Sequence, residues 1–368
     1  MNATQAAVDL DDVEGLLAAD RDGLLRAASM AGAQVRATAA ALAEGDLDGL
    51  KSDQPPRTVI WVAGRGNAET AGAMLSATLG GSVAAPIVVA SEVPPWIGAL
   101  DVLILAGDDS GDPALVSAAA TGVRRGARVV VAAPYEGPLR DATAGRSVSL
   151  APRLWVRDDF RLARYLAAGL AVLQVVDPGL QVDLAALADE LDAEAFRNSA
   201  GRELFTNPAK TLAERMSGRD VVLAGDNAAT LALARHGAAI LLRIAHQAVA
   251  AVGLADALVA VHDGMGGHGA GLAGADHEMA IFHDEQIDGP LPRRVRTFVL
   301  ATDAERPVVV ARVSGLDGVD VINSEDVPQV SDVPQAAVAP ATGRPEQQLA
   351  MLAVRLEMTA TYLRLVRG

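Results

Sequence analysis

The stretch LILAGDDSGDPAL, from Leu103 to Leu115, decides the fold class of this chain. It opens with an apolar run typical of a buried strand, and a glycine turn and a helix start follow. Many α/β proteins hold a phosphate at such a junction, because backbone N–H groups at the start of the helix point towards the ligand. Here three aspartates crowd the turn: Asp108, Asp109 and Asp112. The stretch therefore predicts an α/β fold, and it raises the question of why negative charge lies where an anion would bind.

Strand-like runs and alanine-rich helical stretches alternate along most of the chain. Strands are expected in TVIWVAG, APIVVAS, DVLILAG, ARVVVAAP and SVSLAP in the first half, and in RDVVLAG, DALVAVHD (256–263), RTFVLATD and VDVINSED in the second. Such alternation predicts βαβ units and a parallel sheet covered by helices on both faces. Ligands in such sheets bind at the carboxyl ends of the strands, where the strand order reverses.

The pattern divides the chain into four parts. Residues 1–54 read as a helical segment, 55–178 as a first α/β lobe, 179–215 as a helical connector and 216–368 as a second lobe. The second lobe ends in a helix that follows Pro345, since proline is favoured in the first turn of a helix. We expect two doubly wound, flavodoxin-like lobes with three αβα layers and an N-terminal helical extension.

The composition argues against several classes of function. The formal net charge is −15 and the isoelectric point is about 4.8, so neither nucleic acid nor a membrane is expected as a partner. The chain has no cysteine, which excludes disulfides, thiolate zinc sites and a cysteine nucleophile. The first residues lack the basic and apolar regions of a signal peptide, and no apolar run is long enough to span a bilayer. A cytoplasmic protein is therefore expected.

The turns after the first strands resemble the motifs of a known family. Gly64, Arg65, Gly66 and Asn67 follow the first strand, VPPWI (93–97) follows the second, and Ser110 and Gly111 follow the third. In this order they resemble the sugar isomerase (SIS) domain family, whose motifs there are G-M-G-G-S, L-P-x-x-V and S-x-S-G-x-T-x-x-T. The chain looks most like the bifunctional phosphoglucose/phosphomannose isomerases, which carry two SIS lobes. The resemblance covers residues 55–366 and implies a sugar or sugar phosphate as ligand, no cofactor and a homodimer.

The phosphate-binding turn departs from the family pattern. Asp108 replaces its first serine, and Pro113 and Val116 replace its threonines. Two like unit charges 4 Å apart repel by about 1 kcal/mol in water and by about 4 kcal/mol at an intermediate dielectric constant. The turn therefore favours phosphate less, although Arg65 could supply a positive charge. The alternative is that the other two aspartates cap the following helix.

Two more residues are candidates for ligand contacts. In DDFRLARYL, Phe160 lies where the family has an active-site arginine, so Arg161 or Arg157 is the candidate replacement. The alternative there is a charged helix face. In GDNAAT, Asn227 could hydrogen-bond a sugar hydroxyl, or Asn227 or Asp226 caps the following helix.

In the family, the second lobe carries the chemistry. The resemblance aligns His246, in RIAHQ, with the glutamate that moves a proton between C1 and C2. It aligns His277, in DHEM, with the histidine that helps to open the sugar ring. Histidine is a competent general base, because its unperturbed pKa is about 6.5. The resemblance thus implies conversion of glucose or mannose 6-phosphate to fructose 6-phosphate, although the second lobe lacks any lysine and the family ends in a lysine-bearing tail.

Four histidines lie close together in the second lobe: His262, His268, His277 and His283. With neighbouring carboxylates they could hold a divalent metal ion. Their spacing matches no metal motif, so no metal site is predicted, and a polar lid over a cleft is the alternative. Three functions stay open: a phosphosugar isomerase with an eroded site, a non-catalytic protein that binds a sugar derivative or a partner protein, and a metal-dependent enzyme.

Overall fold

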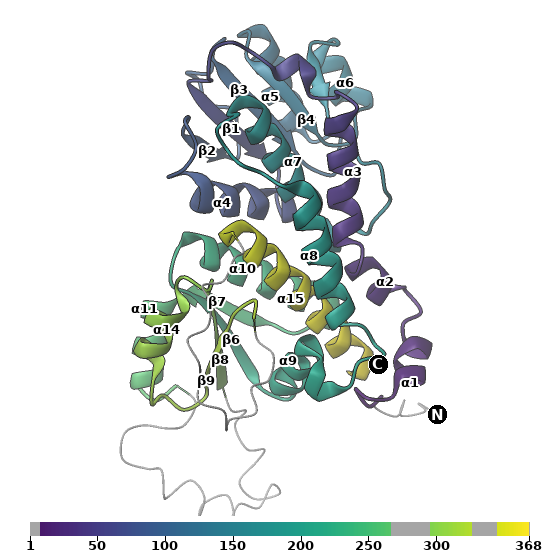
Figure 1. The fold of residues 1–368 in the computed structure, drawn as a ribbon, viewed down its shortest axis with the longest axis vertical. Coiled ribbons are helices and arrows are strands. Elements are labelled where there is room, and N and C mark those ends of the chain that lie inside the picture. Colours follow the sequence, from purple (N-terminus) through teal and green to yellow (C-terminus); the bar gives the residue numbers. More distant parts are fainter. Residues whose placement is uncertain (1–7, 266–294, 326–343, 368) are drawn as a thin grey trace, which may run out of the picture. The chain divides into compact units, whose positions relative to one another are not determined.

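The computed structural model describes residues 8–265, 295–325 and 344–367. The chain divides into two compact units, each built on its own parallel sheet (Figure 1). Unit A is Asp22–Ser199, and unit B is Met1–Arg21 together with Ala200–Gly368. The predicted fold class, two doubly wound α/β lobes, is confirmed.

The sheet of unit A has five parallel strands in the order β2-β1-β3-β4-β5. The strands are β1 (Thr58–Ala63), β2 (Ile87–Ala90), β3 (Asp101–Ala106), β4 (Arg128–Ala132) and β5 (Ser147–Ser149). All six residues of β1 and of β3 are buried, as expected for central strands covered on both faces. Ile60 pairs in register with Leu103, which in turn pairs with Val129.

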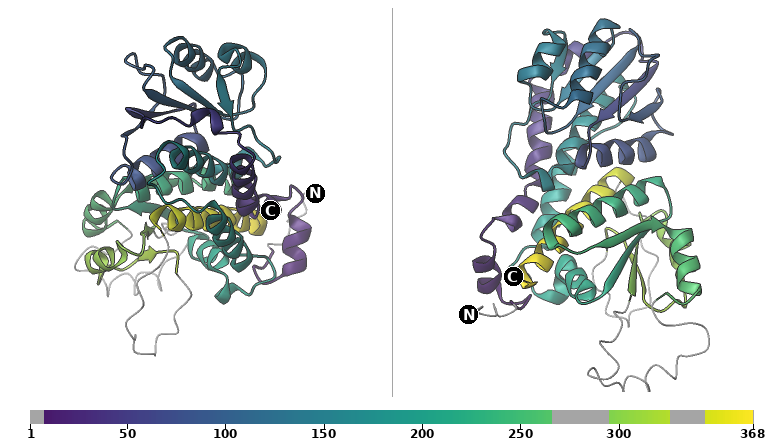
Figure 2. Two further views of the ribbon diagram at one scale, coloured as in Figure 1. Left: turned by 45° about the horizontal axis from the view of Figure 1, so that its top comes forward. Right: turned by 180° about the vertical axis from the view of Figure 1, so that it is seen from behind.

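Helices cover both faces of this sheet (Figure 2). They are α2 (Leu24–Ala28), α3 (Ala31–Ala43), α4 (Asn67–Leu79), α5 (Pro113–Arg124), α6 (Gly137–Thr143), α7 (Leu162–Val176) and α8 (Leu184–Arg197), with 3₁₀ turns η1 (Asp48–Leu50) and η2 (Asp158–Phe160). Leu103 and Leu105 pack with α5 and α6 on one face. Trp61 contacts α4 and α7 on the other face, and α3 packs on α7 and α8. Gly72 of α4, Gly122 of α5 and Gly169 of α7 leave no room for a Cβ, so these helices approach the sheet closely.

The sheet of unit B has four parallel strands in the order β7-β6-β8-β9. The strands are β6 (Asp220–Gly225), β7 (Val249–Gly253), β8 (Val295–Leu300) and β9 (Val319–Ile322). The helices are α1 (Val13–Ala19), α9 (Pro208–Met216), α10 (Ala228–Ala245), α11 (Leu254–His262), α14 (Arg306–Val313) and α15 (Pro345–Arg367), with the 3₁₀ turn η3 (Leu204–Thr206). The final helix begins at Pro345, as its sequence predicts. α11 and α14 cover one face of the sheet, and α10, on which α15 packs, covers the other.

One predicted strand is wrong. DALVAVHD (256–263) lies in helix α11 and the residue that follows it, and the strand is the preceding segment, Val249–Gly253. Leu254 and Ala257, the buried residues of α11, are three apart, which is the spacing of a helix with one face on the core. A short apolar run does not separate the two possibilities by itself, because both a buried strand and a core helix can supply it.

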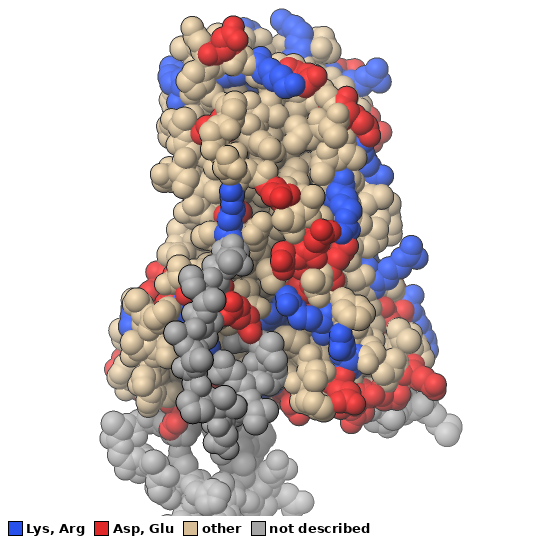
Figure 3. Space-filling view, in the orientation of Figure 1, with Lys and Arg blue, Asp and Glu red and all other residues tan. Residues whose placement is uncertain are grey.

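Charged side chains of both signs are interspersed on the face shown in Figure 3. Several arginines pair with carboxylates of unit A, such as Arg36 with Asp189 at 2.7 Å and Arg153 with Glu44 at 2.7 Å. Within the part of the chain that is described, α10 alone is long and apolar enough to cross a membrane. Most of α10 is buried in unit B, which is the position of a core helix.

Candidate ligand-binding site

The turns after β1 and β3 meet at the carboxyl edge of the sheet in unit A. The two strands are parallel neighbours, with Ala63 opposite Ala106, so both chains leave the sheet at the same edge. The strand order reverses between β1 and β3, which is where doubly wound sheets bind ligands. A Cβ added at Gly64 would lie 2.7 Å from Asp112 Oδ2, so the two turns are in direct contact. The structure therefore brings the predicted residues 64–67 and 108–111 together.

The β1 turn leads directly into α4. Gly66, the residue before the helix, has φ 64° and ψ −134°, a backbone conformation that glycine adopts without strain. Asn67 is buried, and its Nδ2 donates hydrogen bonds to the backbone oxygens of Asp158 at 2.7 Å and Asp159 at 3.1 Å. Asn67 thus fixes the η2 segment beside the turn. Arg65 is exposed and forms no ion pair with the residues that the structure describes, so its charge is available to a ligand.

Asp108 forms the centre of a cluster at this edge. Its Oδ1 accepts hydrogen bonds from Arg161 Nη1 at 2.6 Å and from the Tyr165 hydroxyl at 2.7 Å. Arg161 also donates from Nε to the Val156 carbonyl at 2.7 Å, which holds the guanidinium in place. Tyr165 is fully buried, and this burial raises its pKa, so the phenol remains a neutral donor. We call Asp108, Arg161 and Tyr165 the edge cluster.

The carboxylates of the other two aspartates accept hydrogen bonds from backbone N–H groups. Asp112 is the N-cap of α5, where its Oδ1 accepts a hydrogen bond from Ala114 N at 2.8 Å. Asp109 Oδ1 accepts from Gly111 N at 2.7 Å, within the turn itself. The capping interpretation is therefore confirmed for Asp112, whereas Asp109 stabilises the turn. Both carboxylates occupy backbone N–H groups that a phosphate-binding turn would offer to an anion.

Ser110 lies between these two aspartates and is half-buried. Its carbonyl accepts a hydrogen bond from Leu139 N at 3.1 Å, which joins the turn to α6. Its hydroxyl makes no hydrogen bond with any residue in the described ranges. Ser110 Oγ therefore remains a donor and acceptor at the edge.

Asn227 lies at the carboxyl edge of the other sheet, in unit B. It is the N-cap of α10, and its Oδ1 accepts from Ala229 N at 2.8 Å and from Thr230 N at 2.9 Å. Thr230 completes a capping box with the Asn227 backbone N–H. The Asn227 amide also donates to Glu305. The capping interpretation of Asn227 is confirmed, and its side chain is largely occupied by the protein.

His246 lies at the opposite edge of the same sheet. α10 begins after the carboxyl end of β6 and ends just before β7, so its last residue is at the amino edge. His246 is the exposed C-cap, with a left-handed φ of 53°. The structure does not bring His246 and Asn227 together within unit B. His277, like His268 and His283, lies outside the described residues.

A polar cluster in unit B contains none of the site residues that were predicted from the sequence. Four of its residues, Thr302, Asp303, Glu305 and Ser324, follow the carboxyl ends of β8 and β9, and the fifth, Gln348, belongs to α15. Asp303 Oδ2 accepts from Gln348 Nε2 at 2.6 Å, and Glu305 Oε2 accepts from the Thr302 hydroxyl at 2.6 Å. The available signal was the run of polar residues directly after each strand, as in RTFVLATDAE and VDVINSED. Within the described ranges, no three histidine or carboxylate side chains come close enough to hold a metal ion.

The comparisons with known proteins point to one fold. No family model and no curated protein matches the chain. Among solved structures, it is similar to the C-terminal domain of glucosamine-fructose-6-phosphate aminotransferase from Francisella tularensis, with 11% identity, 95% and 98% of the two chains covered and a TM-score of 0.58. It is similar to tagatose-6-phosphate ketose/aldose isomerase from Escherichia coli, with 14% identity, 100% and 96% covered and a TM-score of 0.60.

A third similar structure is a glucose-6-phosphate isomerase like protein from Thermus thermophilus. Its identity is 20%, 98% and 94% of the two chains are covered, and the TM-score is 0.51. All three match nearly the whole of this chain, so the likeness includes both sheets. At these identities the likeness shows the fold alone: the chain shares the two-lobe α/β architecture of these proteins.

Proposed function

We propose that this protein binds a sugar phosphate or a related carbohydrate derivative at the carboxyl edge of β1 and β3, without isomerase turnover. The observation that carries the proposal is the meeting of the two turns at the point where the strand order reverses. The names of the three similar structures all concern sugar phosphates, which supports the same ligand class. The resemblance to bifunctional phosphoglucose/phosphomannose isomerases adds a cytoplasmic homodimer to the proposal.

Two groups at the edge suit a ligand with many hydroxyls. Arg65 supplies a cation and Ser110 supplies a hydroxyl, whereas the Asp108 carboxylate repels a phosphate. Sugar hydroxyls both donate and accept, so they match such a mixture of groups. A phosphate group would bind beside Arg65, because Asp112 already caps the N-terminus of α5.

The loss of turnover rests on the position of the possible bases. A general base must come within hydrogen-bond reach of the proton that it moves. In unit A, Asp108 Oδ1 already accepts hydrogen bonds from Arg161 and Tyr165, so this oxygen is not free to take a proton from a ligand. In unit B, His246 is at the amino edge of its sheet, away from the edge at which α/β sheets bind ligands.

Calorimetric titration tests the binding. We expect saturable binding of fructose 6-phosphate or glucose 6-phosphate, and weaker binding by about 10-fold in Arg65→Ala, since a charged hydrogen bond contributes about 1.5–3 kcal/mol. Arg125→Ala is the matched control, because Arg125 is an exposed arginine at the end of α5 and should leave affinity unchanged. Equal affinity of the parent and Arg65→Ala, or no binding of any hexose phosphate, would refute the site.

A coupled assay tests the absence of turnover. We expect no conversion of glucose or mannose 6-phosphate to fructose 6-phosphate by the parent protein. Conversion that disappears in His246→Ala would replace this proposal with the alternative that the resemblance implies, an active isomerase with His246 as its base.

A further inference from the structure

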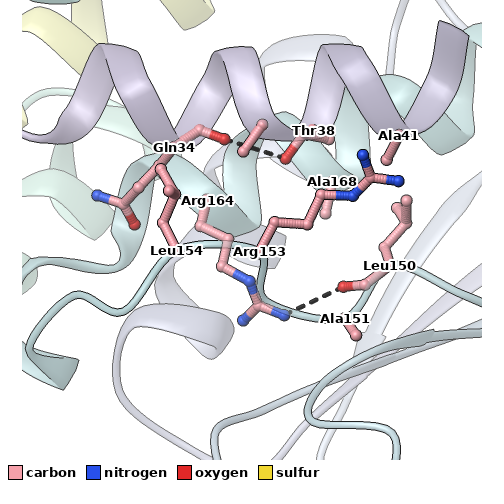
Figure 4. A pocket seen from close by; sticks show the side chains of 10 residues that line it. Gln34, Thr38, Ala41, Leu150, Ala151, Arg153, Leu154, Arg164 and Ala168 are labelled. Atoms are coloured by element: carbon pink, nitrogen blue, oxygen red, sulfur yellow. Dashed lines mark hydrogen bonds between the residues drawn. The ribbon is translucent and has the colours of Figure 1, made fainter. Parts of the chain in front are cut away.

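A small pocket in unit A lies apart from the turns described above. It is enclosed by α3, α7 and the segment 150–154, and it has a volume of about 20 Å³ (Figure 4). Its main lining residues are Gln34, Thr38, Leu150, Arg153, Arg164 and Ala168. This space admits one small polar group but no ring, because one water molecule needs about 10–15 Å³.

Arg164 enters this pocket as a buried cation. The residue is 8% exposed, and its Nη2 donates to the Leu150 carbonyl at 3.2 Å, as Figure 4 shows. Its guanidinium carbon lies 4.9 Å from the centre of the Tyr165 ring. No carboxylate in the described ranges forms an ion pair with it, and its buried Nη1 has no acceptor there. Asp108 attracts Arg164 electrostatically without pairing with it, so the buried guanidinium keeps an N–H group at Nη1 that favours an oxyanion.

Gln34 adds a second unsatisfied group to the same pocket. It is 4% exposed, and its Nε2 donates to the Phe160 carbonyl at 2.9 Å. This hydrogen bond leaves Oε1 buried, with no donor among the residues that the structure describes. Arg153 differs, because its guanidinium already pairs with Glu44 and Asp46, each at 2.7 Å. Among the described residues, the pocket thus offers one cationic donor, Arg164 Nη1, and one acceptor, Gln34 Oε1, without hydrogen-bond partners.

We propose that this pocket is a binding site for a small oxyanion, a carboxylate or phosphate group, held by Arg164 Nη1. Guanidinium groups favour these anions because their N–H groups match the geometry of the oxygens. Gln34 Oε1 accepts a hydrogen bond from a hydroxyl of the same ligand or from a water molecule bound with it. The small volume excludes nucleotide bases and aromatic acids from the pocket itself. This site uses side chains other than those proposed to contact the sugar, although Arg164 also lies beside Tyr165 of the edge cluster.

Binding of acetate and inorganic phosphate to the full chain tests the site, with chloride at equal ionic strength as the reference. We expect the oxyanions to bind more tightly than chloride, and Arg164→Gln to weaken that binding by about 10- to 100-fold, the effect of losing one charged hydrogen bond. Gln34→Glu, which keeps the side-chain volume, should also weaken binding, because it adds a carboxylate to the lining of the same pocket. Gln34→Glu provides a second test if Arg164→Gln fails to fold. The control variant Arg125→Ala should bind oxyanions as tightly as the parent protein does.

A crystal soaked in selenate shows where the anion lies. We expect an anomalous peak for selenium within hydrogen-bond distance of Arg164 Nη1. A water molecule alone between Arg164 and Gln34, with equal affinity for phosphate and chloride, would overturn the proposal. Oxyanion binding that both variants leave unchanged would also overturn it. Neither outcome bears on the sugar site, which Arg65→Ala tests separately.

Discussion

Asp108 supplies from within the protein the negative charge that a phosphate-binding turn normally takes from its ligand. Arg161 and Tyr165 both donate to one oxygen of this carboxylate. Without a ligand, the Asp108 carboxylate is therefore already paired with Arg161. A phosphate would have to compete with Asp108 for this arginine.

The first prediction at the residue scale concerns this competition. Asp108→Ser should strengthen the binding of fructose 6-phosphate by about 10-fold, because it removes a repulsion of about 1–4 kcal/mol and releases Arg161 towards the ligand. Serine keeps an oxygen near the Tyr165 hydroxyl. Calorimetry against Asp109→Ser provides the comparison, since the Asp109 carboxylate bonds only the Gly111 N–H among the residues that the structure describes. Weaker binding by Asp108→Ser would show that the carboxylate contacts the ligand directly.

The left-handed backbone of His246 gives a second prediction. Its φ is 53°, a conformation that costs a side-chain-bearing residue about 1 kcal/mol more than glycine. His246→Gly should therefore raise the free energy of unfolding by about 0.5–1 kcal/mol in urea titrations. Ala144→Gly, at φ 47°, should do the same in unit A, whereas Ala245→Gly, at the buried last residue of α10, should destabilise. Lower stability of His246→Gly would show that a contact of the imidazole stabilises the protein by more than the left-handed backbone costs.

At the scale of elements, Trp61 holds two helices against the sheet of unit A. Its Nε1 donates to the Ala68 carbonyl at 2.9 Å in α4. A Cβ at Gly72 of α4 would lie 2.4 Å from the Trp61 ring, and one at Gly169 of α7 would lie 2.3 Å from Leu75 and 3.0 Å from the ring. Both helices can pack this closely only where they carry glycine.

We therefore predict that Gly169→Ala destabilises the protein by about 1–3 kcal/mol, the usual cost of adding volume to a tightly packed core. Helix propensity acts in the other direction by about 1 kcal/mol, so a net loss measures the steric effect. Gly81→Ala is the control, because a Cβ there meets no atom within 4 Å. Chemical denaturation of the two variants checks the prediction, and an equal or higher stability of Gly169→Ala would contradict it.

Local patterns along the chain were enough to predict most elements. The apolar runs identify β1, β3, β4 and β6, and Pro345 marks the start of α15, because each signal involves residues near in sequence. The prediction of a strand at 256–263 is wrong, because a short apolar run is compatible with both a buried strand and a core helix. In the edge cluster, Asp108 and Arg161 were candidates from their motifs, but the contact with Tyr165 could not be predicted, since Tyr165 is 57 residues from Asp108 and looks like any residue of an apolar helix.

At the scale of the whole molecule, the two units have separate sheets and separate cores. Unit A is one continuous segment, so all the strands and helices of its core are present in residues 22–199. Unit B also needs the start of the chain, where α1 packs on α15 and Asp11 accepts a hydrogen bond from Leu204 N at 2.7 Å.

We predict that a fragment of residues 22–199 folds alone, with helical circular dichroism and a cooperative thermal transition. A fragment of residues 200–368 should be less stable than the same segment with residues 1–21 supplied as a peptide, because it lacks the α1 contacts. An unfolded 22–199 fragment would show that unit A depends on the rest of the chain.

The placement of the tryptophans has a consequence for how unfolding is observed. All three, Trp61, Trp96 and Trp155, belong to unit A, where Trp61 is 1% exposed and Trp155 is 82% exposed. Indole emission thus reports on one half of the chain, with a shielded fluorophore and a solvated one in the same spectrum. Unit B has no tryptophan. A melting curve recorded by tryptophan emission therefore follows the unfolding of residues 22–199 and does not report the unfolding of unit B.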